Sequence, residues 1–432
     1  MSTNEALFER ARQVIPGGVN SPVRAFTAVG GTPYFVARAE GARVWDVEGN
    51  EYLDLVQSYG AVIAGHAHPA VVEAIRSAAG DGTSYGAPTE REVLLAEEIA
   101  RRVPSCQKVR MVSSGTEATM TALRLARGAT GRSRVVKFAG NYHGHGDALL
   151  AESGSAVAHL DPAHSPRGVP GSAGVPPSAV TDTVIAPYND VPELDESIAC
   201  VIVEPVAANM GLVAPVDGFL AGLRAECDRV GALLVFDEVI TGFRLGLGGA
   251  QERFDITPDL TCFGKVIGGG LNVGAFGGRA DVMDLLAPLG PVYQAGTLSG
   301  NPLATAAGLA ALDLCDAAAY RSLVARAERL AAGIGEALAG AGLVATVSTA
   351  GPLVGLHLGP VAPRNYDEAR TTDEDAYAAL FHALLRRGVA LAPGAYEVMF
   401  PGLAHDEEAI DRIVEAMGEA ATEVVAGEAH RP

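Results

Sequence analysis

The sequence is short of aromatic residues, of basic residues and of cysteine pairs, and it lacks long apolar runs. Aromatic side chains make up 6% of its 432 residues, and 32 basic residues stand against 51 acidic ones, which gives a net charge of −19. A surface with that charge repels phosphate backbones and anionic lipids, so we expect neither a nucleic-acid partner nor a membrane partner. An anionic ligand would have to be held by local cations and backbone amides.

The five cysteines are odd in number, widely spaced and never in a CxxC pair. This pattern signals neither a disulfide framework nor a zinc site, and it fits a reducing compartment. No N-terminal segment combines a basic start with an apolar stretch, and a charge, Gly or Pro breaks each apolar run before it reaches the length of a membrane span. We therefore expect a cytoplasmic protein.

The chain is rich in apolar residues, 48% of the total, which is enough for one large or two moderate domains. From about residue 88, helical patterns such as EREVLLAEEIARRV alternate with short β-branched runs: KVRMV, RVVKF, CVIVEP and ALLVFDEV. This alternation predicts right-handed βαβ units and an α/β fold with a largely parallel sheet. Ligands of such sheets bind beyond the carboxyl ends of the strands.

The pattern predicts a helix-and-hairpin segment, a large domain and a smaller C-terminal α+β domain, at residues 1–60, 61–300 and 301–432. The C-terminal part would begin with a linking helix from Pro302 to about Ala319 and would pack against the N-terminal hairpin. Residues 151–181 are rich in Gly, Pro, Ser and Ala, and we expect them to form a lid.

A candidate anion site lies in VSSGTEATMTALRLAR, where a strand runs directly into a helix through Ser113, Ser114, Gly115 and Thr116. The glycine, the hydroxyls and the free amides at the helix start suit an anion such as a phosphate. A simple helix cap, with Ser114 or Thr116 as the capping residue, fits this stretch equally well.

A candidate carboxylate lies in LLVFDEVITGF, where four apolar residues place Asp237 at the carboxyl edge of a buried strand. A buried carboxylate needs a partner that stays cationic, and a protonated heterocyclic nitrogen is such a partner. An aspartate that caps the next turn is the plain alternative, and the neighbouring Glu238 could be the functional acid instead.

A candidate amine, Lys265, follows 28 positions later in TCFGKVIGGGLNVGAF, among small and apolar residues. A lysine with few water contacts has a lowered pKa, as Schiff-base chemistry requires, although most lysines lie on the surface. With the strand-edge aspartate and the phosphate cradle, this lysine completes the three anchors of pyridoxal phosphate: imine, pyridinium nitrogen and phosphate.

The stretch GNYHGHGDALL offers an aromatic ring, Tyr142, that could stack on a flat cofactor. His143, His145 and Asp147 at alternate positions could ligate a metal instead. Because no fourth ligand is indicated and the cofactor already explains the site, we expect no metal.

The opening loop PGGVNSPVRAF carries one cation, Arg24, in an otherwise uncharged stretch. Taken alone, Arg24 is a surface residue with at most a minor ion pair. YQAGTLSGNP, at residues 293–302, is likewise only a polar turn that opens a helix.

Taken together, these stretches resemble one family. SGTEATMTALRLARG, FAGNYHGHGD, VIVEPVAANMG, FDEVITGFR, FGKVIGGG, VYQAGTLSGNPLA and PGGVNSPVRAF are similar to the glutamate-1-semialdehyde 2,1-aminomutases, fold-type I pyridoxal-phosphate enzymes of aminotransferase class III. The resemblance runs nearly end to end and thins after about residue 345. It implies a large domain with a mostly parallel seven-stranded sheet covered by helices, and a smaller α+β domain built from both ends of the chain.

The resemblance implies a role for each cofactor residue. Lys265 would form the Schiff base and move protons, Asp237 would pair with the pyridine nitrogen, and Tyr142 would stack on the ring. Asn209 would lie near the phenolic oxygen. The phosphate would be bound by Ser114, Gly115 and Thr116 and, from the neighbouring subunit of a homodimer, by Gly296 and Thr297.

On the substrate side, the resemblance places Arg24 on the carboxylate, with Ser21 beside it and Glu397 of GAYEVMF facing the substrate. A planar guanidinium can bind both carboxylate oxygens at once. Where the aminomutases read SWGPMILGH, this chain reads SYGAVIAGH, so Tyr59 replaces a tryptophan and Ala61 a proline, and the lid is longer and altered. These departures fall on the enclosure of the substrate and none on the cofactor anchors.

The implied reaction is the isomerisation of glutamate-1-semialdehyde to 5-aminolevulinate, for tetrapyrrole synthesis. It starts from pyridoxamine phosphate and passes through 4,5-diaminovalerate. An intermolecular aminotransferase of the same class, acting on another keto or aldehyde substrate in a specialised pathway, is the alternative that Tyr59 and the lid favour. A non-catalytic protein of this fold would lack Lys265 or Asp237, and both are present.

Overall fold

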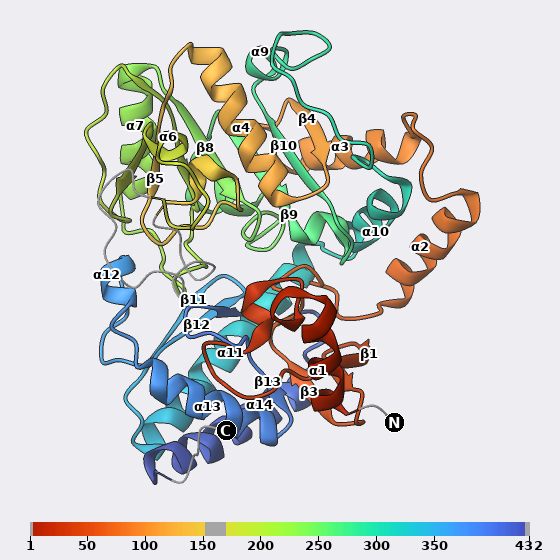
Figure 1. Ribbon diagram of the computed structural model, residues 1–432, viewed down its shortest axis with the longest axis vertical. Coiled ribbons are helices and arrows are strands. Elements are labelled where there is room, and N and C mark those ends of the chain that lie inside the picture. Colours follow the sequence, from red (N-terminus) through yellow and green to blue (C-terminus); the bar gives the residue numbers. More distant parts are fainter. Residues whose placement is uncertain (1–2, 152–169, 428–432) are drawn as a thin grey trace.

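The computed structural model describes residues 3–151 and 170–427, and it forms two lobes, one above the other in Figure 1. The upper lobe contains the large central sheet and the helices around it. The lower lobe contains two small sheets, and in it the red N-terminal segment lies beside the blue C-terminal helices (Figure 1).

The central sheet has seven strands in the order β4-β10-β9-β8-β7-β5-β6. The pairings from β9 through β8, β7 and β5 to β6 are parallel, whereas β10 runs antiparallel to both β4 and β9. The prediction of a mostly parallel seven-stranded sheet is therefore confirmed. The strands are β4 (Lys108–Val112), β5 (Arg134–Phe138), β6 (Thr183–Ala186), β7 (Ile198–Val203), β8 (Leu233–Glu238), β9 (Leu260–Gly264) and β10 (Gly274–Gly278).

Helices cover both faces of this sheet. Successive side chains of a strand point to opposite faces, and here both sets are apolar, so each face needs a layer of helices to bury it. In β7, Val201 and Val203 share a core with α7 (Phe219–Val230), whereas Cys200 and Ile202 share a core with α4 (Gly115–Thr130). The same two-sided burial explains why the predicted strands read as continuous apolar runs. The other helices of this lobe are α2 (Pro69–Asp81), α3 (Glu90–Arg102), α6 (Pro177–Val180), α8 (Gly249–Phe254), α9 (Ala280–Met283) and α10 (Pro302–Asp313).

The lower lobe joins both ends of the chain in one sheet and one core. β13 (Val389–Ala390) extends the N-terminal sheet by pairing in parallel with β3 (Glu51–Asp54), so that Val389 lies opposite Leu53. Phe26 and Leu55 pack in the same apolar core as the C-terminal helices. The domain boundaries near residues 60 and 300 stay a prediction. The remaining elements are β1 (Val36–Glu40), β2 (Arg43–Asp46), β11 (Thr346–Ala350), β12 (Leu353–His357), β14 (Val398–Met399), α1 (Asn4–Val14), α11 (Ala317–Ala341), α12 (Tyr366–Ala369), α13 (Glu374–Arg386) and α14 (Glu407–Val425).

The prediction of a single helix from Pro302 to about Ala319 is wrong. α10 ends at Asp313, and α11 begins after Asp316, whose side chain accepts a hydrogen bond from the main-chain N–H of Ala319 at 2.7 Å. An aspartate favours such a cap over a helix interior, so it starts a new helix. The two helices meet at 79°. No single helix in the described ranges is long and apolar enough to cross a membrane, and only this bent pair passes that test, by length and composition alone.

Most of the predicted lid, residues 151–181, lies outside the described residues, which resume at Pro170. The main-chain N–H of Gly171 donates a hydrogen bond to the carbonyl of Leu150 at 2.7 Å. The described residues on the two sides of this gap are therefore adjacent.

Candidate active site

A cavity of about 360 Å³ lies where β7, β8 and β9 end and α4 begins. This is the edge at which parallel sheets bind their ligands, as the sequence predicts. Polar and titratable residues from segments far apart in the chain line the cavity: Ser58, Ser114, Thr116, Tyr142, His143, Glu204, Asn209, Asp237, Thr241, Lys265 and Asn272.

Lys265 follows β9 directly and opens the short 3₁₀ turn Lys265–Gly268. Its φ of +47° lies in the left-handed region, which costs a non-glycine residue about 1–2 kcal/mol. Burial lowers the pKa of its amine, and the nearby carboxylates of Asp237, Glu204 and Glu397 oppose that shift. The chain therefore holds a partly desolvated amine at the edge of the sheet, in a strained conformation of the kind found at functional sites.

A scarcity that the sequence interpretation overlooked supports the same residue. The chain has only three lysines: Lys108, Lys137 and Lys265. Lys108 is exposed and forms an ion pair with Asp284, and the buried Lys137 donates hydrogen bonds to the carbonyls of Leu149 and Ala151. Of the three, Lys265 is the one that lines the cavity.

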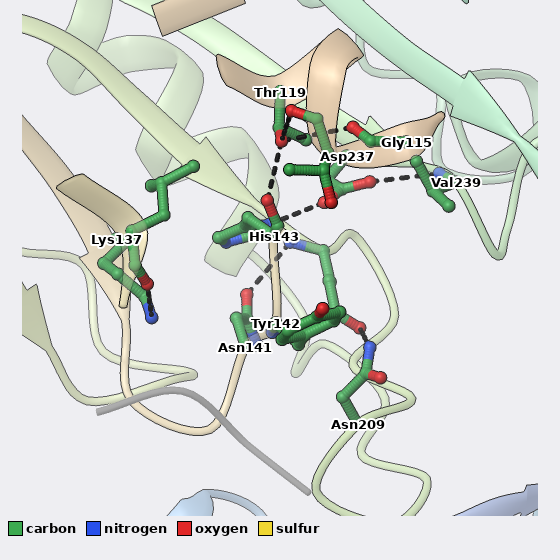
Figure 2. Close-up of polar contacts among 12 residues, drawn as sticks. Gly115, Thr119, Lys137, Asn141, Tyr142, His143, Asn209, Asp237 and Val239 are labelled. Carbon is green, nitrogen blue, oxygen red and sulfur yellow. Dashed lines mark hydrogen bonds and ion pairs between the residues drawn. The ribbon is translucent and has the colours of Figure 1, made fainter. Parts of the chain in front are cut away.

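Asp237 lies at the end of β8, and its carboxylate is held from two sides. One oxygen lies 2.7 Å from Nδ1 of His143, and the other accepts the main-chain N–H of Val239 at 3.1 Å (Figure 2). Glu238 points the other way, where it accepts hydrogen bonds from the main-chain N–H of Ala250 and the hydroxyl of Thr241. The alternation of the strand thus gives Asp237 to the cavity and makes Glu238 a structural carboxyl, whose pKa burial raises to about 7.

His143 is hydrogen-bonded to Asp237 and is not grouped with other potential metal ligands in the part of the chain that the structure describes. Its side chain is buried, its carbonyl accepts the hydroxyl of Thr119 at 2.6 Å, and burial lowers the pKa of its ring (Figure 2). His145 and Asp147 are exposed. Within residues 3–151 and 170–427, no group of three His, Cys, Asp or Glu side chains is placed to hold a metal ion. The alternate spacing of these residues therefore does not bring them together as ligands.

Glu204, a buried carboxyl at the end of β7, was missed by the sequence interpretation. Its oxygens accept hydrogen bonds from the main-chain N–H groups of Tyr142 and Ala208, at 2.7 and 2.9 Å, and from the amide of Asn209 at 3.0 Å. Burial, together with the charge of Asp237, raises its pKa to about 7. The sequence does contain the signal that identified Asp237, an acidic residue after an apolar run. In VIVEP, Glu204 follows the apolar run of β7 in the same way as Asp237 follows that of β8.

The start of α4 serves both as a helix cap and as part of the cavity. The hydroxyl of Ser114 caps the helix by accepting the main-chain N–H of Glu117 at 3.2 Å, which confirms the plain interpretation. Gly115 and Thr116 also line the cavity, so the first turn of α4 faces the space in which the sequence predicts an anion. The loop of Gly144 packs so closely here that an added Cβ would lie 2.4 Å from the Thr116 hydroxyl.

The predicted substrate residues do not themselves line the cavity, but Tyr59 lies between Ser58 and Ala61, which do. Burial and the charge of Glu397 raise the pKa of Tyr59, and the guanidinium of Arg24 opposes that shift. Arg24 is exposed on the 3₁₀ turn Pro22–Ala25, where its main-chain N–H donates to the carbonyl of Ser21 at 3.1 Å. Its guanidinium forms no hydrogen bond or ion pair with any residue that the structure describes. Arg24, Tyr59 and Glu397 are thus assembled from positions more than 300 residues apart in the chain.

Tyr59 belongs to a turn with an uncommon backbone. Gln57, Ser58 and Tyr59 have φ values of +45°, +53° and +55°, and Gly60 follows at +89°. Three successive non-glycine residues in this region cost about 1–2 kcal/mol each, so the surrounding structure must hold the turn in place. Ser58 and Ala61 of this segment line the cavity.

Gly296 and Thr297 do not reach the cavity of their own chain. They line a separate hollow of about 540 Å³, together with Tyr85 and Ser299. Tyr293 and Leu298 nearby are exposed, at 71% and 53%. The structure therefore leaves these two predicted phosphate residues on the outside of the chain.

In this protein a lysine, an aspartate at the end of a strand and the N-terminus of a helix line one cavity at the edge of a seven-stranded sheet. This combination of fold and cavity defines its class. The chain belongs to the class III aminotransferase family, whose sequence model matches residues 26–421.

Known proteins of this kind match almost the whole chain. A protein of Bordetella avium (strain 197N), described as glutamate-1-semialdehyde 2,1-aminomutase, is 54% identical over 415 residues, which are 94% of this chain and 96% of that protein. An omega-transaminase from Sphaerobacter thermophilus superposes with a TM-score of 0.89 at 34% identity, over 98% of both chains. A glutamate-1-semialdehyde aminomutase variant from Pseudomonas aeruginosa PAO1, in complex with PMP, superposes with a TM-score of 0.86 at 30% identity, over 98% of this chain and 94% of that one.

Proposed function

We propose that the protein is a pyridoxal-phosphate-dependent aminomutase that converts glutamate-1-semialdehyde into 5-aminolevulinate, for tetrapyrrole synthesis. The observation that carries the proposal is the convergence of Lys265, Asp237 and the N-terminus of α4 on one cavity. The relative that is 54% identical over 94% of this chain bears the name of this enzyme, whereas the solved transaminase and the solved aminomutase superpose at 34% and 30% identity. The intermolecular aminotransferase is therefore the less favoured function.

The residues of the cavity fit pyridoxal or pyridoxamine phosphate. The carboxylate of Asp237 is a partner for a protonated pyridine nitrogen, and its hydrogen bonds to His143 and Val239 fix its orientation. The first turn of α4, with Ser114, Gly115 and Thr116, offers main-chain N–H groups and a positive dipole to the phosphate.

The side chains around the ring site fit the same group. Tyr142 lines the cavity and offers its ring for stacking, and Glu204 holds both the main chain of Tyr142 and the amide of Asn209. Asn209 would use the second N–H of this amide to donate to an oxygen of the cofactor ring. When bound, the cofactor carries the amino group and stabilises negative charge on the substrate carbon.

Lys265 is the group that moves protons. The lowered pKa of its amine leaves a larger unprotonated fraction at neutral pH than a solvent-exposed lysine has, so Nζ can take a proton from one carbon and return it to another. Asp237, Glu204 and Glu397 limit the shift in pKa, so the protonated form stays accessible as well. The amine can therefore act as base and as acid in turn.

The substrate is held at the other end of the site. The guanidinium of Arg24 has no partner among the described residues and offers a fork for the substrate carboxylate, with Ser21 at the start of its turn. Tyr59 and Glu397, which lie close enough for the charge of Glu397 to raise the pKa of Tyr59, would present a phenol and a carboxyl to the amino groups of the intermediate, 4,5-diaminovalerate.

The active form in this proposal is a homodimer in which Gly296 and Thr297 bind the phosphate in the neighbouring subunit. Their exposed position, and the exposed apolar side chains of Tyr293 and Leu298 beside them, support it. Sedimentation of the active enzyme is expected to give twice the mass of one chain. Full activity at a dilution where only single chains sediment would contradict the shared site.

We also propose that the enzyme works in the cytoplasm, on a small carboxylate substrate and without nucleic-acid or membrane partners. All five cysteines are free and buried, which fits a reducing compartment. The net charge of −19 opposes binding to anionic polymers and surfaces.

The proposed function predicts many turnovers without an added amino donor. The enzyme in its pyridoxamine form, given glutamate-1-semialdehyde alone, is expected to release 5-aminolevulinate in large molar excess over active sites, because the amino group returns to the cofactor in each cycle. The measurement is the amount of 5-aminolevulinate per active site over time. A single turnover that stalls until a donor is added would identify an intermolecular aminotransferase instead.

A further inference from the structure

The buried arginine Arg244 is not explained by the chemistry described above. Its side chain has 0% exposure, and Nη2 donates to the carbonyl of Gly60 at 2.7 Å and Nη1 to the carbonyl of Pro401 at 3.4 Å. Within the described residues it forms no ion pair, and its guanidinium lies 5.5 Å from the ring centroid of Phe400. Burial lowers its pKa to about 10. Burying a cation without a carboxylate partner costs free energy of folding. We therefore expect Arg244 to have a specific role that compensates for this cost.

The carbonyl that Arg244 binds most closely ends the left-handed turn Gln57–Gly60. Phe400 packs on the same glycine, where an added Cβ would lie 2.8 Å from the ring. The other end of the turn is fixed by Asp54, whose carboxylate accepts the main-chain N–H groups of Val56 and Gln57 at 2.8 and 3.1 Å. The strained turn is therefore held at its start by an anion and at its end by a cation.

This turn has one residue at the proposed cofactor cavity and the next among the proposed substrate residues. Ser58 lines the cavity beside Lys265, and Tyr59 lies near the charges of Arg24 and Glu397. A shift of the turn would move both side chains relative to the substrate and leave the cofactor anchors on β8, β9 and α4 in place. Burial lowers the pKa of the Lys265 amine, and the positive charge of Arg244 makes a smaller contribution in the same direction.

We propose that Arg244 is a positioning residue: its buried guanidinium holds the turn Gln57–Gly60 against the loop at Pro401 and so sets the places of Ser58 and Tyr59 for the substrate. The inference rests on the proposed function only for the identity of the substrate. The restraint on the turn is a property of the chain itself.

The test compares Arg244→Met with Arg326→Met in the holoenzyme. Arg326 is a suitable control because it also donates to loop carbonyls, those of Gly402 and Leu403, but forms no hydrogen bond with the described residues of the turn. Arg244→Lys is a second variant, which keeps the positive charge but loses the planar guanidinium. It allows the same measurements if the methionine variant does not fold. The readouts are amide hydrogen exchange at residues 60–62, whose N–H groups close the turn, and KM measured separately from kcat.

In Arg244→Met we expect exchange at residues 60–62 to speed up about tenfold or more and KM to rise about tenfold, with kcat changed less. Arg244→Lys should fall between this variant and the native enzyme, and Arg326→Met should leave both readouts within about twofold of native. Native exchange at residues 60–62 in Arg244→Met, or equal effects of both methionine variants, would overturn the inference. If the native enzyme does not convert glutamate-1-semialdehyde, the exchange measurement still decides this inference, and KM is taken with the substrate that it does convert.

Discussion

Lys265→Ala is expected to lower kcat by about 10⁴-fold or more and to leave the cofactor bound. The substitution removes the nucleophilic amine and the proton carrier together, and each of these functions alone contributes at least about 10²-fold. Asp237 and the N-terminus of α4, which hold the other ends of the proposed cofactor, are untouched. The measurements are single-turnover rates and the cofactor absorbance that remains with the protein after gel filtration.

Lys137→Met is the matched control for this experiment. Lys137 is the other buried lysine, and its amine donates to two main-chain carbonyls and does not line the cavity. Its replacement should lower the midpoint of thermal unfolding and leave kcat within about threefold. Normal turnover in Lys265→Ala would overturn the assignment of the whole site.

Arg24→Ala is expected to lower kcat/KM for glutamate-1-semialdehyde by about 10²-fold or more, mostly through KM. Arg24 is exposed in the free chain, and we expect the bound substrate to cover it. A bidentate guanidinium–carboxylate pair that is removed from water in this way contributes several kcal/mol, far more than an exposed ion pair does. Arg24→Lys should recover only part of the loss, because an ammonium binds the two oxygens as a point charge. Steady-state kinetics of both variants, with cofactor absorbance to show that loading is unchanged, provide the measurement.

Arg38→Lys is the control for Arg24, since Arg38 is an exposed arginine of the same N-terminal segment that pairs with Glu40 and lies over the ring of Trp45. We expect its kinetics to stay native. A second comparison uses a substrate analogue with an esterified carboxylate, which the native enzyme should use poorly and Arg24→Ala no worse than the free acid. If Arg24→Lys keeps the native KM, the clamp role is wrong and the loop is only a feature of the fold.

Much of the central domain could be predicted, because its signals are local. The β-branched runs and helical patterns after residue 88 fold as the alternation indicates, and they place Asp237, Lys265 and the start of α4 at one sheet edge. The helix after Pro302 was predicted too long, since Asp316 caps a new helix and the chain turns by 79° between the lobes. Apolar periodicity alone could not show that break, because both helices are rich in the same small apolar residues.

The site itself was only partly predictable. The choice between Asp237 and Glu238 depended on which face of β8 meets the cavity. The alternate spacing of His143, His145 and Asp147 suggested metal ligands, whereas in the structure His143 is hydrogen-bonded to Asp237. Glu204 showed the same strand-edge signal as Asp237 and was overlooked.

By itself, the sequence determined where the proposed cofactor anchors lie, since each lies at or just after the end of a strand of the central sheet and the ends of these strands meet at one edge. The tertiary structure alone decided which residues form the proposed substrate end. Arg24, Tyr59 and Glu397 are brought together by a lower lobe built from both ends of the chain, and the turn of Tyr59 keeps its left-handed backbone through Asp54 and Arg244. Contacts between segments so far apart depend on packing and on the desolvation of charges, which no local pattern of residues encodes.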